Sequence, residues 1–313
     1  MVKDNKNTID MNNIRLTDQG GADRINNISM WLKRRFGRKM IKLSIDGGFT
    51  CPNRDGSKGE GGCLFCGEGA GGDFASDIDG QIRLYQTKWP DAGYIAYFQN
   101  HTNTYAPVDE LRSKFYSALD DPRISGIAIA TRPDCLPEDI LDLLTEINRD
   151  HFLWVELGLQ TIHDRTAEVI NRCYPLSVYD EAMDKLNSRG IRTVTHLILG
   201  LPGETKEDME QSVRYVCKKS TWGIKLHMLN VVKGSRMAVE MLDYVPFDSM
   251  DDYIALVCDL IEIIPPEVTI HRLTADAPRK TLIAPEWSYM KRSILNGIHA
   301  ELRRRGTRQG SRL

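Results

Sequence analysis

The chain has 313 residues, of which 41% are hydrophobic and 27% are charged, and its formal net charge is -2. This composition is typical of a soluble globular protein that buries a large core. No apolar run is long enough to cross a bilayer, and residues 1–19 lack the apolar core of a signal peptide. We therefore expect a cytoplasmic protein without a membrane partner.

The predicted elements begin after residues 1–28, which are polar, rich in Asn and Asp, and expected to form a flexible lead. A strand starts at Lys39 and runs directly into a glycine-rich loop. Beyond the loop, strand-like apolar segments alternate with helical segments. The predicted helices are residues 76–88, 107–119, 137–148, 163–172, 177–188 and 205–218, and the further strands are residues 94–98, 126–131, 153–160, 192–199 and 223–232.

This alternation predicts βα units and hence a parallel α/β sheet with right-handed crossovers. The six predicted strands fall short of the eight of a full barrel, so we predict an open, partial (β/α)6 TIM-like barrel with its chemistry at the C-terminal strand ends. Residues 237–244, 249–264 and 285–305 are predicted helices, interrupted by an extended segment at 268–273. The predicted domains are a lead (1–28), a barrel (29–235) and a helical C-terminal extension with a basic tail (236–313).

Three cysteines in the loop after the first strand indicate a metal centre. Cys51, Cys63 and Cys66 lie within a glycine-rich segment, and three thiolates suit a soft metal or an iron-sulfur cluster. A closed zinc site wants four protein ligands, and no fourth Cys or His is near in the sequence. A four-iron cluster would keep one iron open for a small molecule; a zinc knuckle or free surface thiols are the alternatives.

The remaining cysteines are scattered singly along the chain, and we expect them to be buried, reduced side chains. They are Cys135, Cys173, Cys217 and Cys258. The chain contains neither a GxxxxGK[ST] loop nor a strand followed by GxGxxG, which leaves nucleotide hydrolysis and NAD chemistry without support.

Further motifs lie at predicted strand ends, and they are Thr131-Arg-Pro-Asp134, Glu156-Leu-Gly-Leu-Gln160 and His196-Leu-Ile-Leu-Gly-Leu-Pro-Gly-Glu-Thr205. Their order, together with the Cys loop, resembles that of the radical S-adenosylmethionine (SAM) enzymes. They are similar to the branch that holds the Elongator catalytic subunit and oxygen-independent coproporphyrinogen oxidase. The long spacing between Cys51 and Cys63 resembles small bacterial members implicated in tRNA wobble-uridine modification.

The resemblance implies a [4Fe-4S] cluster on Cys51, Cys63 and Cys66, with SAM bound to its open iron. It also implies SAM contacts along the strand ends, from Phe65, Gln99, Thr102, Glu156, Gln160, Arg172, His196 and Asn230. Two departures from the family pattern stand out. The glycines of the usual turn after the second strand are replaced from Gln99 onward, and Ala130 stands where relatives carry a Glu.

The resemblance further implies that reduced cluster and SAM generate a 5'-deoxyadenosyl radical, with electrons from a donor such as flavodoxin or ferredoxin. His101, Tyr105, His271 and Arg272 are the candidates for contacting the substrate. We expect a tRNA substrate, whose carboxymethylaminomethyl wobble uridine would be converted to aminomethyl, with Arg272 recognising the carboxylate. A radical SAM enzyme for a metabolite or peptide, and a non-enzymatic cluster or zinc protein that binds RNA, are the alternatives.

Two basic segments are either solvated faces or phosphate-binding surfaces. The first lies between residues 31 and 42, and the second is the C-terminal tail, which we expect to be a free segment. The tail cations are Arg303, Arg304, Arg305, Arg308 and Arg312.

Overall fold

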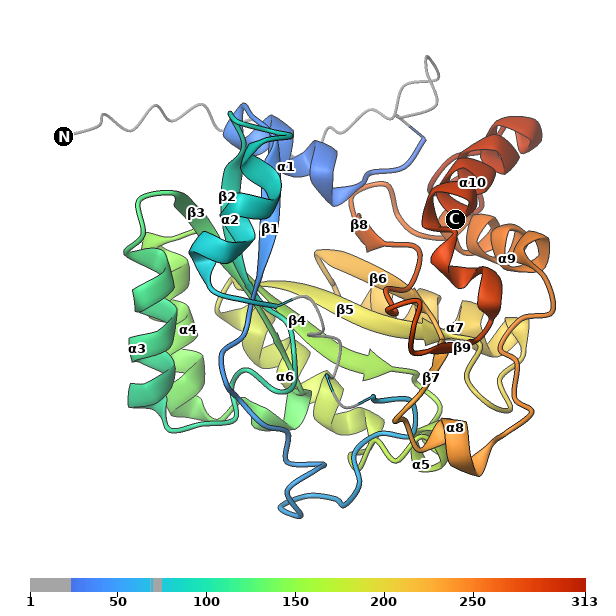
Figure 1. Ribbon diagram of the computed structural model, residues 1–313, viewed down its shortest axis with the longest axis horizontal. Helices are drawn as coiled ribbons and strands as arrows, with labels where there is room; N and C mark the ends of the chain where they lie inside the picture. Colours follow the sequence, from blue (N-terminus) through green and yellow to red (C-terminus); the bar gives the residue numbers. More distant parts are fainter. Residues whose placement is uncertain (1–23, 68, 70–74) are drawn as a thin grey trace.

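The computed structural model describes residues 24–67, 69 and 75–313, and its centre is a parallel sheet of seven strands (Figure 1). The strands lie in chain order across the sheet, which curls into a half-barrel. They are β1 (Met40–Ile45), β2 (Gly93–Phe98), β3 (Ile124–Thr131), β4 (Leu153–Gln160), β5 (Arg192–Leu199), β6 (Gly223–Met228) and β8 (Thr269–Arg272). The predicted open barrel is therefore confirmed.

The seventh strand, β8, comes from the extended segment that the sequence assigned to the C-terminal extension. Gly223 and Ile224 of β6 pair in parallel with Thr269 and Ile270 of β8. The predicted strand at 223–232 is divided, since β6 ends at Met228. A short β7 (Val231–Val232) then pairs antiparallel with β9 (Leu282–Ala284).

Alternate strand residues face the helices and the barrel lumen, as the two-residue period of a strand requires. Ile127 and Ile129 of β3 belong to the core beneath the helices, whereas Ala128 and Ala130 belong to a separate cluster on the lumen side. No described helix is long and apolar enough to cross a membrane. The outer helices are α2 (Ile78–Gln86), α3 (Val108–Leu119), α4 (Glu138–Asp150), α5 (Asp164–Val169), α6 (Leu176–Ser188), α7 (Lys206–Lys218), α8 (Met237–Glu240), α9 (Met250–Glu262) and α10 (Lys291–Arg305).

The turn from β5 into α7 is tight because glycines occupy its left-handed positions. Gly200 and Gly203 have φ angles of 83° and 77°, which a side chain with a Cβ rarely adopts. Thr205 then caps α7: its hydroxyl accepts from the Asp208 backbone N–H, and the Asp208 carboxylate accepts from the Thr205 N–H. This capping box fixes the first turn of α7, while the Glu204 carboxylate accepts a hydrogen bond from Thr161.

A helix that the sequence analysis missed, α1 (Ile28–Phe36), closes the N-terminal end of the half-barrel. It contacts both edge strands, β1 and β8. Its Trp31 stacks on Phe152 at a centroid distance of 5.7 Å and meets Trp222 edge-on at 5.0 Å. The predicted lead is thus shorter than residues 1–28, since residues 24–28 are packed; residues 1–23 lie outside the described residues.

The C-terminal tail is folded back onto α9, so the expectation of a free basic segment is wrong. Arg305 Nη1 lies 2.6 Å from the Asp259 carboxylate, and Arg312 Nη1 lies 3.3 Å from that of Glu262. Arg304 pairs with Glu301 on its own helix. Acidic side chains of α9 and α10 therefore neutralise much of this basic charge.

Gln309 fastens the tail to the start of the barrel and should contribute to stability. Its buried side chain accepts a hydrogen bond from the Asn26 N–H at 2.9 Å and donates to Val268 O at 2.7 Å. Gln309→Ala should lower the free energy of unfolding by roughly 1–3 kcal/mol, because buried backbone groups lose their partners. Urea unfolding measures this. The exposed Arg303→Ala is the control, and equal stability of the two variants would contradict the prediction.

Candidate active site

The Cys loop (residues 46–67) leaves the C-terminal end of β1 and lies across the mouth of the half-barrel, at the end opposite α1 (Figure 1). Backbone hydrogen bonds shape it. Arg54 N–H donates to Cys51 O at 2.8 Å, and Cys66 N–H donates to Cys63 O at 3.0 Å. Leu64 N–H donates to the carbonyl that follows α5, at 3.0 Å. The loop is therefore tied to the end of the barrel at which chemistry was predicted.

The three thiols lie close enough to influence one another electrostatically. Burial raises the pKa of the Cys63 thiol to about 12, and Cys66 and Cys51 add to the rise. Asn53 Nδ2 donates to Cys63 Sγ at 3.4 Å. Burial also raises the pKa of the Cys66 thiol, and the charge and hydrogen bond of Arg54 partly offset this rise. Donors and a cation thus surround the sulfur atoms, as thiolate ligands require.

Within the described residues, no group of three or more His, Cys, Asp or Glu side chains is arranged to hold a metal ion. The assignment of Cys51, Cys63 and Cys66 as ligands therefore stays a prediction. Of the other cysteines, Cys135 and Cys258 are buried as expected. Cys173, in contrast, is exposed and lies against Gly59 of the Cys loop, so the expectation that it is buried is wrong.

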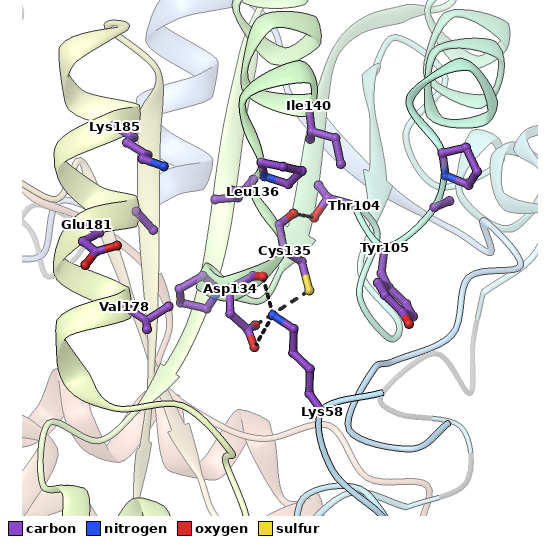
Figure 2. Close-up of a pocket in the computed structure, with 15 residues that line it drawn as sticks. Lys58, Thr104, Tyr105, Asp134, Cys135, Leu136, Ile140, Val178, Glu181 and Lys185 are labelled. Atoms are coloured by element: carbon purple, nitrogen blue, oxygen red, sulfur yellow. Dashed lines mark hydrogen bonds and ion pairs between the residues drawn. The ribbon is translucent and has the colours of Figure 1, made fainter. Parts of the chain in front are cut away.

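Side-chain contacts anchor the Cys loop to the ends of neighbouring strands. Asn53 Nδ2 donates to Asn171 O at 2.6 Å. Figure 2 shows Lys58 reaching from the loop to Asp134, where its Nζ lies 3.1 Å from Oδ2 and 2.7 Å from the backbone carbonyl. Asp134 also accepts two hydrogen bonds from Arg132, each at 2.9 Å. The Thr131–Asp134 motif after β3 thus holds the loop in position.

A pocket of about 760 Å³ lies beside this anchor, on the side of the outer helices (Figure 2). Tyr105 and Lys58 form one wall, and Val178, Glu181 and Lys185 of α6 form the opposite wall. The Tyr105 hydroxyl lies 2.6 Å from Ser57 Oγ. Tyr105, predicted to contact the substrate, therefore packs against the Cys loop outside the barrel lumen.

The backbone is unusual around the mouth. The described non-glycine residues with positive φ are His101, Gln160, Asn171, Cys173 and Ser220. All but Ser220 lie at strand ends or beside the Cys loop, and such conformations gather at functional sites because the surrounding structure must enforce them. Gln160 and His101, both predicted site residues, have φ angles of 67° and 59°.

Several predicted site residues carry buried polar atoms without a hydrogen-bond partner in the described structure. They are His101 Nδ1, Thr102 Oγ1 and Asn230 Oδ1, and the neighbouring Asn100 Oδ1 shares this property. Burial and the charge of Arg54 lower the pKa of His101. Since unpaired buried polar atoms are costly, their concentration at the ends of β2 and β6 indicates space for a polar ligand. Gln99 is partly buried at the same rim, and Phe65 packs on the apolar cluster below the loop.

Arg172, the predicted partner of the SAM carboxylate, is buried and largely engaged. Its Nε donates to Tyr174 O at 3.0 Å and its Nη1 to Leu159 O and Thr161 O, while Nη2 lies 3.1 Å from Asp164 Oδ1. A guanidinium has five N–H bonds, so one Nη2 hydrogen is left for the predicted contact. The visible role of Arg172 is to hold the turn after β4.

A buried polar network occupies the middle of the lumen, and Glu156 is its centre. Glu156 is fully buried and forms an ion pair with Lys225 Nζ. Tyr97 donates its hydroxyl to Glu156 at 2.6 Å, Trp154 donates its indole N–H at 2.8 Å, and His196 Nε2 lies 2.9 Å away. Burial alone would raise the pKa of Glu156, but Lys225 and His196 hold it well below its usual value. Glu156 is thus ionised, and both of its carboxylate oxygens have hydrogen-bond partners.

The lumen network contains residues that the sequence analysis missed. Tyr97, Trp154 and Lys225 each stand inside an apolar strand, and His227 stacks on His196 at a centroid distance of 5.2 Å. An isolated polar or aromatic residue at an inward strand position is the only signal in the sequence. Nothing local shows that these positions converge, because they belong to different strands.

The remaining predicted substrate residues, His271 and Arg272, lie on β8 at the open edge of the half-barrel. His271 Nε2 is 3.0 Å from Thr269 Oγ1, and its ring meets Trp222 edge-on at 5.1 Å. Arg272 Nη2 is 2.9 Å from Asp276 Oδ2. Burial and nearby Lys42 lower the pKa of His271. Both residues therefore belong to the lumen, as a substrate-contacting role requires.

Two protein-family models together match most of the described chain. The family model described as the Radical SAM superfamily matches residues 53–216, and the Radical_SAM C-terminal domain matches residues 221–304. The Bacillus subtilis protein YtqA is 46% identical over 92% of this chain and 92% of its own length.

One more distant relative has a named activity, and one solved structure shares the fold. The tRNA uridine(34) acetyltransferase of Dehalococcoides mccartyi is 27% identical over 58% of this chain, which spans only 39% of that protein. The solved structure of the archaeal Methanocaldococcus infernus Elp3 superposes with a TM-score of 0.62 at 15% identity, over 74% of this chain and 58% of that one. This structural likeness supports the fold.

The lumen histidine His196 should make stability depend on acid pH. Burial and Lys225 lower its pKa to about 4, whereas an unfolded histidine titrates near about 6.5. The unfolded chain therefore binds an extra proton between these values, and the free energy of unfolding should fall as the pH drops from about 6.5 toward 4. His196→Gln should flatten this slope in urea titrations. His151→Gln, outside the lumen, is the control; an unchanged slope in His196→Gln would contradict the assignment.

Proposed function

The chain belongs to the radical SAM superfamily, and from this premise we propose that it modifies the wobble uridine of tRNA, converting a carboxymethylaminomethyl side chain to aminomethyl. The observation that carries the proposal is the polar lumen beneath the Cys loop, combined with the relation to a tRNA uridine(34) acetyltransferase. We propose that the reaction takes place in the cytoplasm.

Enzymes of this superfamily use a [4Fe-4S] cluster and SAM, which together supply a carbon-centred radical when both are bound. The residues present fit the cluster by their chemistry. Cys51, Cys63 and Cys66 share one loop, Asn53 donates to Cys63 Sγ, and Arg54 bonds Cys66. In the proposed enzyme the loop holds the cluster at the mouth, while Asn53 and Arg54 stabilise thiolate charge.

The strand ends offer the polar groups that SAM needs. The unpaired atoms His101 Nδ1, Thr102 Oγ1 and Asn230 Oδ1 face no protein partner in the described structure, so each can bind a ligand without breaking an existing hydrogen bond. Gln99, Gln160 and the last Nη2 hydrogen of Arg172 complete the proposed SAM contacts. In our proposal Glu156 and His196, in contrast, do not contact SAM, because their side chains already bond one another. They lie beneath SAM, in the lumen network.

In our proposal the substrate enters the lumen from the mouth and not from the opposite end. α1 and its aromatic contacts with Phe152 and Trp222 close the N-terminal end, which excludes water from the reacting group. For tRNA binding we propose exposed cations near the mouth, in place of the neutralised C-terminal tail. They are Lys233, Arg279 and Lys280. We propose a small electron-transfer protein such as flavodoxin or ferredoxin as the reductant.

Substitution of a cysteine in the Cys loop should abolish activity, whereas substitution of a cysteine elsewhere should not. Cys63→Ala should abolish the iron-sulfur absorbance and the formation of 5'-deoxyadenosine from SAM, because one iron loses its anionic ligand. The measurement is anaerobic reconstitution followed by chromatography of the nucleosides. Cys258→Ala, which alters a buried thiol beneath α10, should retain both signals. Undiminished 5'-deoxyadenosine from Cys63→Ala would overturn the ligand assignment.

The substrate is tested directly with tRNA. Reconstituted enzyme, SAM and a reductant should convert tRNA bearing carboxymethylaminomethyluridine to the aminomethyl form, and tRNA from cells lacking the protein should accumulate the carboxymethylaminomethyl form. Mass spectrometry of nucleosides measures both. Robust SAM cleavage without any change in tRNA, in vitro and in cells, would favour a metabolite or peptide substrate instead.

A further inference from the structure

Positive charge exceeds negative charge in the middle of the barrel lumen. Lys225 is neutralised by Glu156, with which it forms the buried ion pair. Arg272 shares the single carboxylate of Asp276 with Lys291. Lys42 of β1 faces the same space, since its Nζ lies 4.7 Å from the centroid of the Tyr97 ring.

No acid neutralises Lys42 within the described residues. Its ammonium forms no ion pair or hydrogen bond there, and its contact is the face of the Tyr97 ring. Burial lowers the pKa of Lys42, Arg272 lowers it further, and Glu156 is the one carboxylate that raises it. Because Glu156 already pairs with Lys225, a partly buried cation is left without a counter-charge, which is costly unless an anion binds there.

Lys42 and Arg272 lie on the two edge strands of the open sheet, β1 and β8, which curl toward one another. Two histidine nitrogen atoms in the same space, His227 Nε2 and His271 Nδ1, are buried and have no hydrogen-bond partner in the described structure. Lys42 stands three residues before the end of β1, or about 10 Å below the mouth at the rise of a strand. These groups therefore surround a space directly beneath the proposed SAM contacts.

We propose that Lys42 and Arg272 bind the carboxylate of the substrate side chain, and that this contact positions the neighbouring CH2 group beneath the mouth. The inference rests on the proposed function for the identity of the substrate. Arg272 can form a bidentate contact with a carboxylate, whereas Lys42 contributes a point charge from the opposite edge. The Glu156–Lys225 pair and Tyr97 form the fixed base of the site and hold the Lys42 ammonium over the aromatic ring.

The test is a pairwise comparison of Lys42→Met and wild-type holoenzyme on two substrates, tRNA bearing carboxymethylaminomethyluridine and the same tRNA with that carboxylate converted to a methyl ester. Lys42→Met should raise the KM for the acid roughly ten- to a hundredfold, the range for loss of a charge-assisted contact. For the ester the two enzymes should differ little. An equal loss on acid and ester would show that Lys42 contacts a phosphate or only supports the fold, and would overturn the proposal.

Lys39→Met is the matched control. Lys39 directly precedes β1, and its Nζ also lies over an aromatic ring, 4.1 Å from the centroid of Trp89. Its side chain, however, is exposed outside the lumen. The KM of the Lys39→Met enzyme should equal that of the wild type for both substrates. SAM cleavage without substrate should also be unchanged in Lys39→Met.

Amine labelling tests the site without turnover. The SAM-loaded holoenzyme is acetylated in the presence of the 5-carboxymethylaminomethyluridine nucleoside, of glycine and of inorganic phosphate, and the modified lysines are quantified by mass spectrometry. The carboxylate probes should slow labelling of Lys42 and leave Lys39 unaffected. If the wild type fails to modify tRNA but the carboxylates protect Lys42, the proposed function fails and the anion site stands. Labelling of Lys42 that no carboxylate slows would overturn the anion site.

Discussion

The buried ion pair of Glu156 and Lys225 is the interaction on which the lumen depends. Two charges can be held away from water only when their mutual attraction is supplemented by hydrogen bonds, and here Tyr97, Trp154 and His196 supply them. Strands β2, β4, β5 and β6 each contribute a side chain, so the network fixes the relative positions of four strands. Removal of one partner from such a pair typically costs about 3–5 kcal/mol. The same network keeps the lumen polar, so that a charged group can enter a barrel otherwise built from apolar strands.

The two ends of the half-barrel follow from different kinds of packing. At the N-terminal end, Trp31 of α1 meets Phe152 and Trp222, and this aromatic contact closes the lumen. At the C-terminal end the chain leaves the strands in loops whose backbone is held by specific contacts, such as that of Lys58 with Asp134. At this end His101 Nδ1, Thr102 Oγ1 and Asn230 Oδ1 have no hydrogen-bond partner in the described structure. In the proposed reaction the substrate and the cofactor therefore meet at the mouth, where the cysteines lie.

Local patterns predicted the part of the structure that is local. The alternation of apolar strands and amphipathic helices predicted the order of the βα units. The missed features depend on contacts between distant segments. Nothing near Lys225 in the sequence shows that Glu156 will face it, and the basic run around Arg305 looks free until Asp259 and Glu262 of α9 are brought beside it. The residues 269–272 likewise become a strand only because the edge of β6 is available for pairing.

That seventh strand changes what the open barrel can do. A sheet of six strands would end at β6, and the lumen would then be bounded by Lys225 and His227 on one side. With β8 in position, His271 and Arg272 form a second wall that faces Lys42 of β1. The sheet is still unclosed, so in the proposed reaction the bulk of the substrate stays at the mouth while its small charged side chain enters the lumen. Cations on both edges of an open sheet thus fit the proposed substrate, a large molecule that presents a small anionic group.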